Sequence, residues 1–217
     1  MARVFRPFAC VAALALAAAG CGDATAPSAA NEAVRAEAPA EPLPEIVHVR
    51  LETEAGPILL RLDHKRAPVT TANFVRYADQ RRFDGTYFYR AARTRGASGR
   101  GFVQGGIRRS ARKAFPPIAH EPTTKTGINH VDGTVSMARA APVGAMGDFF
   151  IVVGGAMPAM DANGAEPGFA AFGRVDQGMD VVRQILAAPT VANAGRGAMR
   201  GQMLEKPVRI VSARRVD

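Results

Sequence analysis

The sequence predicts a mainly β fold, a closed or nearly closed barrel of short strands, and two observations carry this prediction. Short runs that are apolar, aromatic or alternating are typical of strands, and they lie at residues 46–51, 58–62, 86–90, 133–138, 149–153, 170–175 and 208–216. Only two segments, which open at Pro68 and Gly178, have a helical pattern. Many short strands with few helices favour closure, because joining the first strand to the last removes exposed strand edges.

The first elements form a hairpin followed by a helix. Residues 46–51 alternate roughly between apolar and polar side chains, residues 54–57 (Glu-Ala-Gly-Pro) mark a turn, and residues 58–62 form the returning strand. Pro68 opens the first helix, since proline suits the first helical turn. This helix continues to Ala78.

The second helix and the last strand complete the predicted domain. Residues 178–186 have an amphipathic pattern that Pro189 ends. Residues 208–216 are the closing strand, and no internal repeat is seen. We therefore expect one globular domain over residues 46–217.

The N-terminus predicts export. Arg3 and Arg6 form a short positive region, and residues 8–19 are apolar throughout. That run is too short for a stable membrane span, which needs about 20 residues, but it has the length of the apolar part of a signal peptide. We expect residues 1–20 to be a signal peptide and the mature protein to be periplasmic.

Residues 16–21 (Leu-Ala-Ala-Ala-Gly-Cys) resemble a bacterial lipoprotein signal, in which the cysteine becomes the lipidated N-terminus. Ala18 departs from that pattern, which usually has leucine there, and ordinary cleavage after residues 17–19 is the alternative. We expect lipidation of Cys21 and anchoring to the membrane. Cys10, the other of the two cysteines, lies in the leader. A mature chain without a disulfide or free thiol suits an oxidising compartment.

Residues 21–45 are rich in alanine, proline and glutamate and have no apolar period. This composition predicts a flexible or semi-extended tether between anchor and domain. A disordered tail fits the same residues equally well.

Composition and charge narrow the function. Apolar residues make up 47% of the 217, enough to bury a core, and the net charge is +9. The basic residues are scattered with no long run, which favours a solvated basic surface over nucleic-acid binding. The four histidines, His48, His64, His120 and His130, have no metal-ligand spacing, and we interpret them as structural or surface groups. We expect a monomer without metal, cofactor or nucleic acid.

Six blocks of residues carry a family resemblance. They are Arg61-Leu62-Asp63 with Ala67-Pro68-Val69-Thr70-Thr71-Ala72-Asn73-Phe74; Phe88-Tyr89-Arg90; Phe102-Val103-Gln104-Gly105-Gly106; Gly133-Thr134-Val135-Ser136-Met137-Ala138-Arg139; Asp148-Phe149-Phe150-Ile151; and Phe172-Gly173-Arg174-Val175 with Gly178-Met179-Asp180-Val181-Val182. In this order they resemble the motifs of the cyclophilins. The resemblance covers about residues 46–217. It implies an eight-stranded antiparallel barrel capped by two helices, and cis/trans isomerase activity on proline-containing peptides and unfolded exported proteins.

The resemblance also implies a site. Rotation of an X-Pro amide crosses a barrier of roughly 18–20 kcal/mol that comes from resonance, and a guanidinium near the nitrogen stabilises the twisted form. Arg90 is the implied catalytic residue. The implied substrate-binding residues are Phe102, Phe150 and Met160 as an apolar socket for proline, Gln104 to orient Arg90 or hold the substrate, Ala138 and Arg139 to offer backbone groups, and Asp148 and Phe169 beside them.

Three features depart from the family. Residues 91–100 read as a long, polar, basic loop. Asp148 replaces a glutamine, where it could pair with Arg90 or Arg139 or select basic substrates, and Phe169 stands where many members have histidine. Asp148 and the altered loop favour an alternative, a peptide-binding chaperone of the same fold with weak or no isomerase activity. A third hypothesis is a basic envelope protein that contacts anionic lipid.

Overall fold

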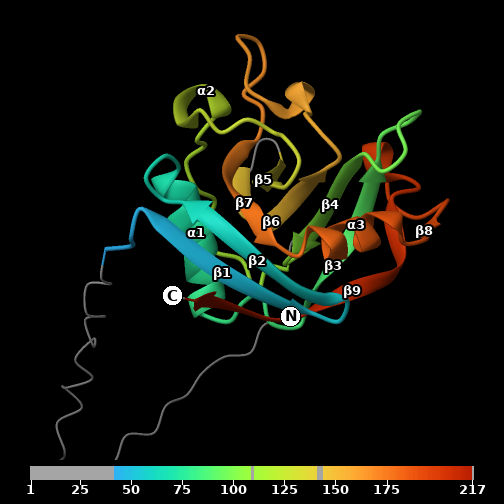
Figure 1. Ribbon diagram of the computed structural model, residues 1–217, viewed down its shortest axis with the longest axis horizontal. Coiled ribbons are helices and arrows are strands. Elements are labelled where there is room, and N and C mark those ends of the chain that lie inside the picture. The colour runs from blue at the N-terminus through green and yellow to red at the C-terminus, as the bar shows by residue number, and fades with distance from the viewer. Residues whose placement is uncertain (1–41, 109, 141–143, 217) are drawn as a thin grey trace, which may run out of the picture. The chain divides into compact units, whose positions relative to one another are not determined.

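A computed structural model of the chain describes residues 42–108, 110–140 and 144–216 (Figure 1). The predicted signal peptide, Cys21 and most of the predicted tether lie outside the described residues. Leu43, near the end of that tether, packs against the core, and the backbone carbonyl of Glu45 accepts a hydrogen bond from the Lys65 backbone at 3.1 Å. Within the described ranges, no helix has the length and apolar character needed to cross a membrane.

Eight antiparallel strands close into a barrel, as the sequence predicts. Their spatial order is β1 (Ile46–Thr53), β2 (Gly56–Asp63), β7 (Ala170–Gln177), β5 (Thr134–Ala140), β6 (Gly144–Val153), β4 (Gly101–Gly106), β3 (Thr86–Arg93) and β9 (Met203–Val216), and β9 pairs with β1. A further strand of two residues, β8 (Thr190–Val191), pairs with the start of β9.

The β1–β2 hairpin shows how the sequence pattern becomes a core. Val47, Val49 and Leu51 are buried, while the residues between them are not. Gly56 follows the turn with φ of +127°, and a Cβ there would stand 2.9 Å from Val181. Glycine suits this position both because side chains rarely adopt that backbone conformation and because no side chain fits.

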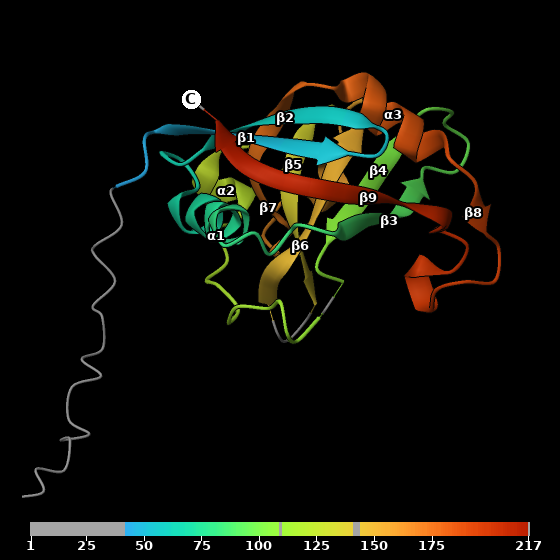
Figure 2. The ribbon, with the colours of Figure 1, turned by 90° about the horizontal axis from the view of Figure 1, so that it is seen from below.

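Helices α1 (Pro68–Asp79) and α3 (Met179–Ala187) lie at opposite ends of the barrel (Figures 1 and 2). α1 begins at Pro68 as predicted, and its Phe74 ring packs 5.2 Å from Phe149 and 5.3 Å from Phe172 at the barrel's end. α3 buries Val182 and Ile185. Three short helical turns were not predicted: α2 (Thr123–Thr126) and the 3-10 helices η1 (Pro158–Met160) and η2 (Gly197–Met199).

The prediction of a long loop over residues 91–100 is wrong at its beginning. Ala91 and Ala92 are buried in β3, which continues to Arg93, so only residues 94–100 connect β3 to β4. Two small apolar residues fit this strand because Ala91 pairs with Val103 and Ala92 with Phe102. Arg93 donates from Nε to the Leu186 carbonyl at 2.8 Å, and so satisfies a carbonyl in the last turn of α3.

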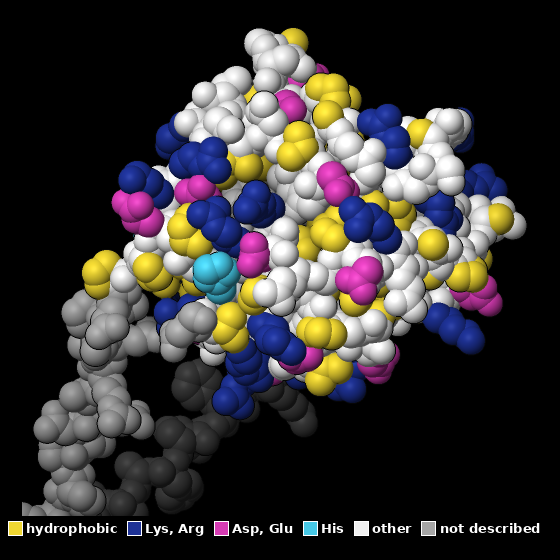
Figure 3. Space-filling view, in the orientation of Figure 1, with side chains coloured by type: hydrophobic (Ala, Val, Ile, Leu, Met, Phe, Trp, Pro, Cys, Tyr) yellow, Lys and Arg dark blue, Asp and Glu magenta, His cyan; other side chains and the backbone are white. Residues whose placement is uncertain are grey.

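The surface is basic but mixed. On the face shown in Figure 3, lysine and arginine side chains are spread among aspartates and glutamates. Ion pairs such as Arg214–Asp84 at 2.7 Å and Arg183–Asp132 at 2.9 Å tie some of these charges together. Interspersed charge of this kind is typical of a solvated surface.

Candidate active site

One cavity of about 590 Å³ is lined by all nine residues that the family resemblance implies for catalysis or substrate binding. They come from four strands and the turns beside them: Arg90, Phe102, Gln104, Ala138, Arg139, Asp148, Phe150, Met160 and Phe169. The cavity lies against the outer face of the barrel wall, since Phe88 and Phe149, neighbours of lining residues, point into the core.

A β-bulge places the arginine. Phe88 pairs with Gly105 and Arg90 pairs with Gln104, so one extra residue is accommodated in β3. A bulge turns consecutive side chains to the same face of a sheet, and Tyr89 and Arg90 accordingly both line the cavity while Phe88 stays in the core. The β9 partner strand is also irregular here, and it contains Pro207, which suits a break in the ladder because it has no N–H.

Two amides hold the guanidinium of Arg90. Its Nη1 donates to Gln104 Oε1 at 2.8 Å, and its Nε and Nη2 donate to Gln202 Oε1 at 2.9 and 2.7 Å. Its Cζ lies 4.9 Å from the centre of the Phe102 ring. Burial lowers the pKa of Arg90 from its usual value, which is high enough that the group keeps its charge at neutral pH. The result is a fixed cation at the edge of an apolar surface.

A polar chain continues from Gln104. Its Nε2 donates to the Tyr89 hydroxyl at 2.8 Å, and the backbone N–H of Arg108 donates to Asp148 Oδ1 at 2.7 Å. Burial raises the pKa of Tyr89, and the charge of Asp148 and its hydrogen bond to the phenol raise it further. The phenol is therefore neutral and acts as a link between the amide of Gln104 and the carboxylate of Asp148.

The apolar part of the cavity is aromatic. The Phe150 ring centre lies 5.3 Å from those of Phe102 and Phe169, the latter edge to face. Met160, from η1, lines the same cavity. Arg139 donates from Nε to the Gly168 carbonyl at 2.8 Å and lies over the Phe169 ring. Flat rings around an apolar hollow give a surface on which a proline ring can pack.

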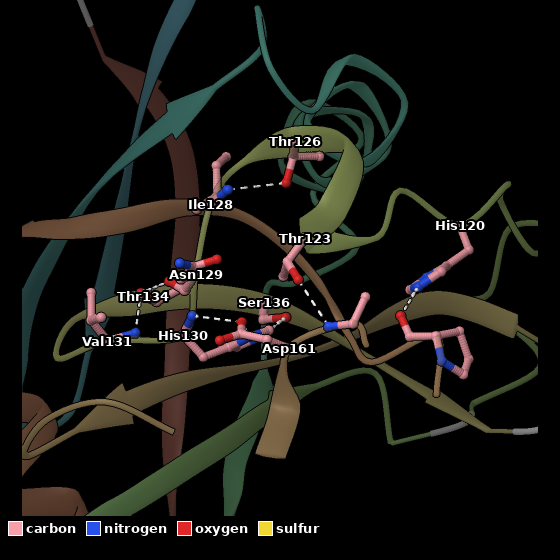
Figure 4. A network of polar contacts seen from close by, with 12 residues as sticks. His120, Thr123, Thr126, Ile128, Asn129, His130, Val131, Thr134, Ser136 and Asp161 are labelled. Atoms are coloured by element: carbon pink, nitrogen blue, oxygen red, sulfur yellow. Dashed lines mark hydrogen bonds and ion pairs between the residues drawn. The ribbon is translucent and has the colours of Figure 1, made fainter. Parts of the chain in front are cut away.

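A buried histidine packs against this aromatic wall, and its polar contacts are drawn in Figure 4. The His130 ring stacks against Phe150 at 5.8 Å, its Nδ1 contacts Asp161 Oδ1 at 2.6 Å, and its Nε2 contacts Ser136 Oγ at 2.9 Å. The three groups have the order of a Ser-His-Asp triad, but Ser136 is 0% exposed and His130 is 1% exposed. A nucleophile must reach its substrate, so this network is structural, in agreement with the interpretation of His130 from the sequence.

One wall of the cavity was not predicted from the sequence. Residues 194–204, between β8 and the first part of β9, contribute Arg196, Met199 and Met203 to the lining. Gln202 belongs to this segment, and its backbone carbonyl also accepts from the Ala91 N–H at 2.9 Å. A single glutamine in a Gly- and Ala-rich stretch has no local pattern, so nothing near it in the sequence pointed to Arg90.

Within the described ranges, no group of three or more histidine, cysteine, aspartate or glutamate residues is placed so that it could hold a metal ion. What the geometry offers is a fixed arginine, an aromatic hollow and an adjacent strand, β5. The fold and the site therefore define the class of protein as a closed antiparallel barrel with an external cavity beside a fixed arginine.

Comparison with known proteins names the family. The family described as cyclophilin type peptidyl-prolyl cis-trans isomerase/CLD matches residues 48–215. Peptidyl-prolyl cis-trans isomerase A of Dickeya dadantii is 35% identical over 144 residues, which are 66% of this chain and 73% of that protein. A peptidyl-prolyl cis-trans isomerase of Acinetobacter baylyi is 32% identical over 165 residues, 76% of this chain and 82% of that protein. The chain belongs to the cyclophilin-type peptidyl-prolyl cis-trans isomerase family.

Solved structures agree on the fold. A cyclophilin-type isomerase of Cryptosporidium parvum superposes with a TM-score of 0.59 at 16% identity, covering 79% of this chain and 98% of that one. A second structure of that protein, in the presence of the dipeptide Ala-Pro, superposes with the same TM-score at 18% identity, covering 78% of this chain and 99% of that one. Similarity at this identity supports the eight-stranded barrel alone.

Proposed function

We propose that the domain accelerates cis/trans isomerisation of X-Pro bonds in unfolded exported proteins, with Arg90 as the catalytic residue. One observation carries the assignment of the site. Arg90 is fixed by Gln104 and Gln202 at the edge of a hollow walled by Phe102 and Phe150. The proline ring occupies the hollow, and the amide nitrogen faces the guanidinium.

The mechanism needs no covalent step. The barrier of about 18–20 kcal/mol comes from conjugation of the nitrogen lone pair with the carbonyl, and rotation frees that lone pair. A donor held in place for the twisted amide stabilises it more than the planar one, and every ~1.4 kcal/mol of such preference is worth about tenfold in rate. Because Arg90 is already oriented, little ordering remains to be done in the transition state. Ala138 and Arg139 at the end of β5 provide the backbone beside which the extended peptide lies.

The decisive experiment measures isomerisation of a prolyl peptide by the full chain and by Arg90→Ala. We expect Arg90→Ala to lose at least about tenfold in kcat/KM, with an unchanged melting temperature. Arg90→Lys keeps the charge but loses the fork of hydrogen bonds. Its kcat/KM is expected to lie between those of the wild type and Arg90→Ala. Arg174→Ala, which removes an exposed arginine of β7, is the matched control. Equal activity of Arg90→Ala and the wild type would refute the assignment.

A second candidate function is a peptide-binding chaperone with weak activity, and Asp148 favours it. Its carboxylate is linked through Tyr89 and Gln104 to Arg90, so its negative charge opposes the field of the guanidinium at the site. Asp148→Asn would raise kcat if this opposition limits the rate. Absence of wild-type activity on varied peptides that nevertheless bind would establish the chaperone.

The exported, lipid-anchored state is part of the proposal and is supported by residues 1–21 alone. Metabolic labelling with a fatty acid tests it. The wild-type chain should be labelled and Cys21→Ser should not. Label that persists in Cys21→Ser would exclude lipidation at this cysteine.

A further inference from the structure

A second hollow of about 460 Å³ adjoins the first. The two share Tyr89, Arg108 and Pro207 as lining residues, so they lie on two sides of the same side chains. We call the second hollow the side pocket; Tyr87, Ile107 and Lys113 line it together with the shared residues. A peptide that fills the first cavity therefore passes close to the side pocket.

The walls of the side pocket combine apolar surface with positive charge. Ile107, Pro207 and the half-exposed ring of Tyr87 provide the apolar part, while Arg108 and Lys113 are its charged lining residues. Arg209 adds a third cation nearby, since its Nη2 lies 3.7 Å from where a Cβ on Gly85 would stand. The side pocket's described lining contains no carboxylate.

Lys113 is held in place without being neutralised. Its Nζ donates to the backbone carbonyl of Asp84 at 2.7 Å, and the Asp84 carboxylate is itself bound by Arg214 at 2.7 and 2.8 Å. An ammonium group has three N–H donors, so two stay outside this bond. Among the described residues, no carboxylate forms an ion pair with Lys113.

One negative charge lies next to the side pocket, because Asp148 Oδ1 is 2.9 Å from where a Cβ on the lining residue Gly106 would stand. Asp148 lines the first cavity, where it accepts from the Arg108 N–H and contacts the Tyr89 phenol. The first cavity also contains Arg90, Arg139 and Arg196. Cations outnumber this one carboxylate across both hollows, which disfavours the selection of basic substrates by Asp148.

We propose that the side pocket binds the side chain of a glutamate in the same peptide whose proline occupies the first cavity. The stem of glutamate packs on Ile107 and Pro207, and its carboxylate meets Lys113 and Arg108. This inference rests on the proposed function, because it treats the first cavity as the prolyl site. It makes the enzyme selective for acidic segments around proline.

The test uses a set of peptides that each contain one X-Pro bond. Each peptide carries a single Glu, Gln or Lys, placed at one of the three positions before or the three positions after that bond. For the full chain at low salt, we expect one position at which Glu exceeds Gln about two- to fivefold in kcat/KM, the range of a partly exposed ion pair, and at which Lys is below Gln. The ratio of kcat/KM for the Glu peptide to that for the Gln peptide should approach one in 1 M salt, where the screening length is about 3 Å.

Variants of Lys113 identify the source of the preference. Lys113→Met should bring the Glu/Gln ratio close to one, Lys113→Arg should keep it, and Lys113→Glu should favour the Lys peptide. Lys125→Met, on the distant turn α2, is the control and should leave both the ratio and the activity unchanged. A ratio that is the same in Lys113→Met and the wild type, or no position with a preference for Glu, would overturn the proposal.

Binding of the same peptides, labelled with a fluorophore, separates this inference from the proposed function. If the wild type isomerises none of them, the proposed function fails, and the Glu/Gln ratio of dissociation constants then tests the side pocket alone. A preference for Glu that Lys113→Met abolishes would support it there too. Equal binding of Glu and Gln peptides at every position would refute it.

Discussion

At the scale of single residues, the orientation of Arg90 depends on an amide far away in the chain. Gln202 stands 112 residues after Arg90 and accepts two of its hydrogen bonds, while Gln104 accepts one. Hydrogen bonds to a charged group are typically worth 1.5–3 kcal/mol. Gln202 does not line the cavity, so we expect it to act through Arg90, as a positioning residue.

Removing this amide should therefore lower kcat more than it raises KM. We expect Gln202→Ala to reduce kcat about tenfold, the effect of ~1.4 kcal/mol of lost transition-state stabilisation, with KM changed less than twofold. Steady-state kinetics on a prolyl peptide measure both. Gln177→Ala, at the exposed end of β7, is the control. A changed melting temperature with an unchanged kcat would mean that Gln202 has only a structural role.

At the scale of elements, the sequence predicts the strands and helices that have a local residue pattern. It does not predict features that depend on the register between paired strands. The alternating residues of β1 and the proline at the start of α1 identified those elements. The family motifs, taken in order, identified nine residues that all line one cavity. The bulge that turns Arg90 outward was not predicted, because it is set by pairing with both β4 and β9. Gln202 was missed for the same reason: its partner is brought to it by the closure of the barrel.

The network of His130 also joins elements, because it ties the residue after η1 to β5. Asp161 follows η1, Ser136 lies in β5, and the His130 ring contacts both. Burial lowers the pKa of His130 from its usual 6.5, although Asp161 partly opposes the shift. The folded state thus prefers neutral histidine.

The stability of the protein should depend on this preference in a defined pH window. Because the unfolded chain binds a proton more readily than the folded one, the contribution is complete above about pH 6.5 and is lost as the pH falls below it. We expect the melting temperature to drop between pH 7 and 5 in the wild type and to drop less in His130→Gln. His64→Gln should behave as the wild type. Parallel pH profiles of wild type and His130→Gln would contradict the assignment.

At the scale of the whole molecule, the two faces of the barrel wall have different roles. Side chains on the inner face form the core that stabilises the fold, and side chains on the outer face line the candidate site. Phe149 and Phe150 are neighbours on β6, and both are nearly inaccessible, with exposures of 0% and 2%. Phe149 belongs to the core, where its ring packs against Phe74 and Phe88 at 5.2 and 5.6 Å. Phe150 instead lines the external cavity with Phe102. Because successive side chains of a strand point to opposite faces, one phenylalanine packs in the core and its neighbour lines the cavity.

Truncating each of the two should have opposite consequences. Phe149→Ala leaves a void inside the core, so we expect it to lower the free energy of unfolding by about 3–5 kcal/mol while the folded fraction keeps near-normal kcat/KM. Phe150→Ala opens onto a hollow that already exists, so it should cost less stability but lose most of the activity, because the proline ring loses its wall. Urea unfolding and kcat/KM corrected for folded fraction measure the two effects. If Phe150→Ala were the more destabilising and kept its activity, Phe150 would be a core residue and the hollow beside Arg90 would not be the prolyl site.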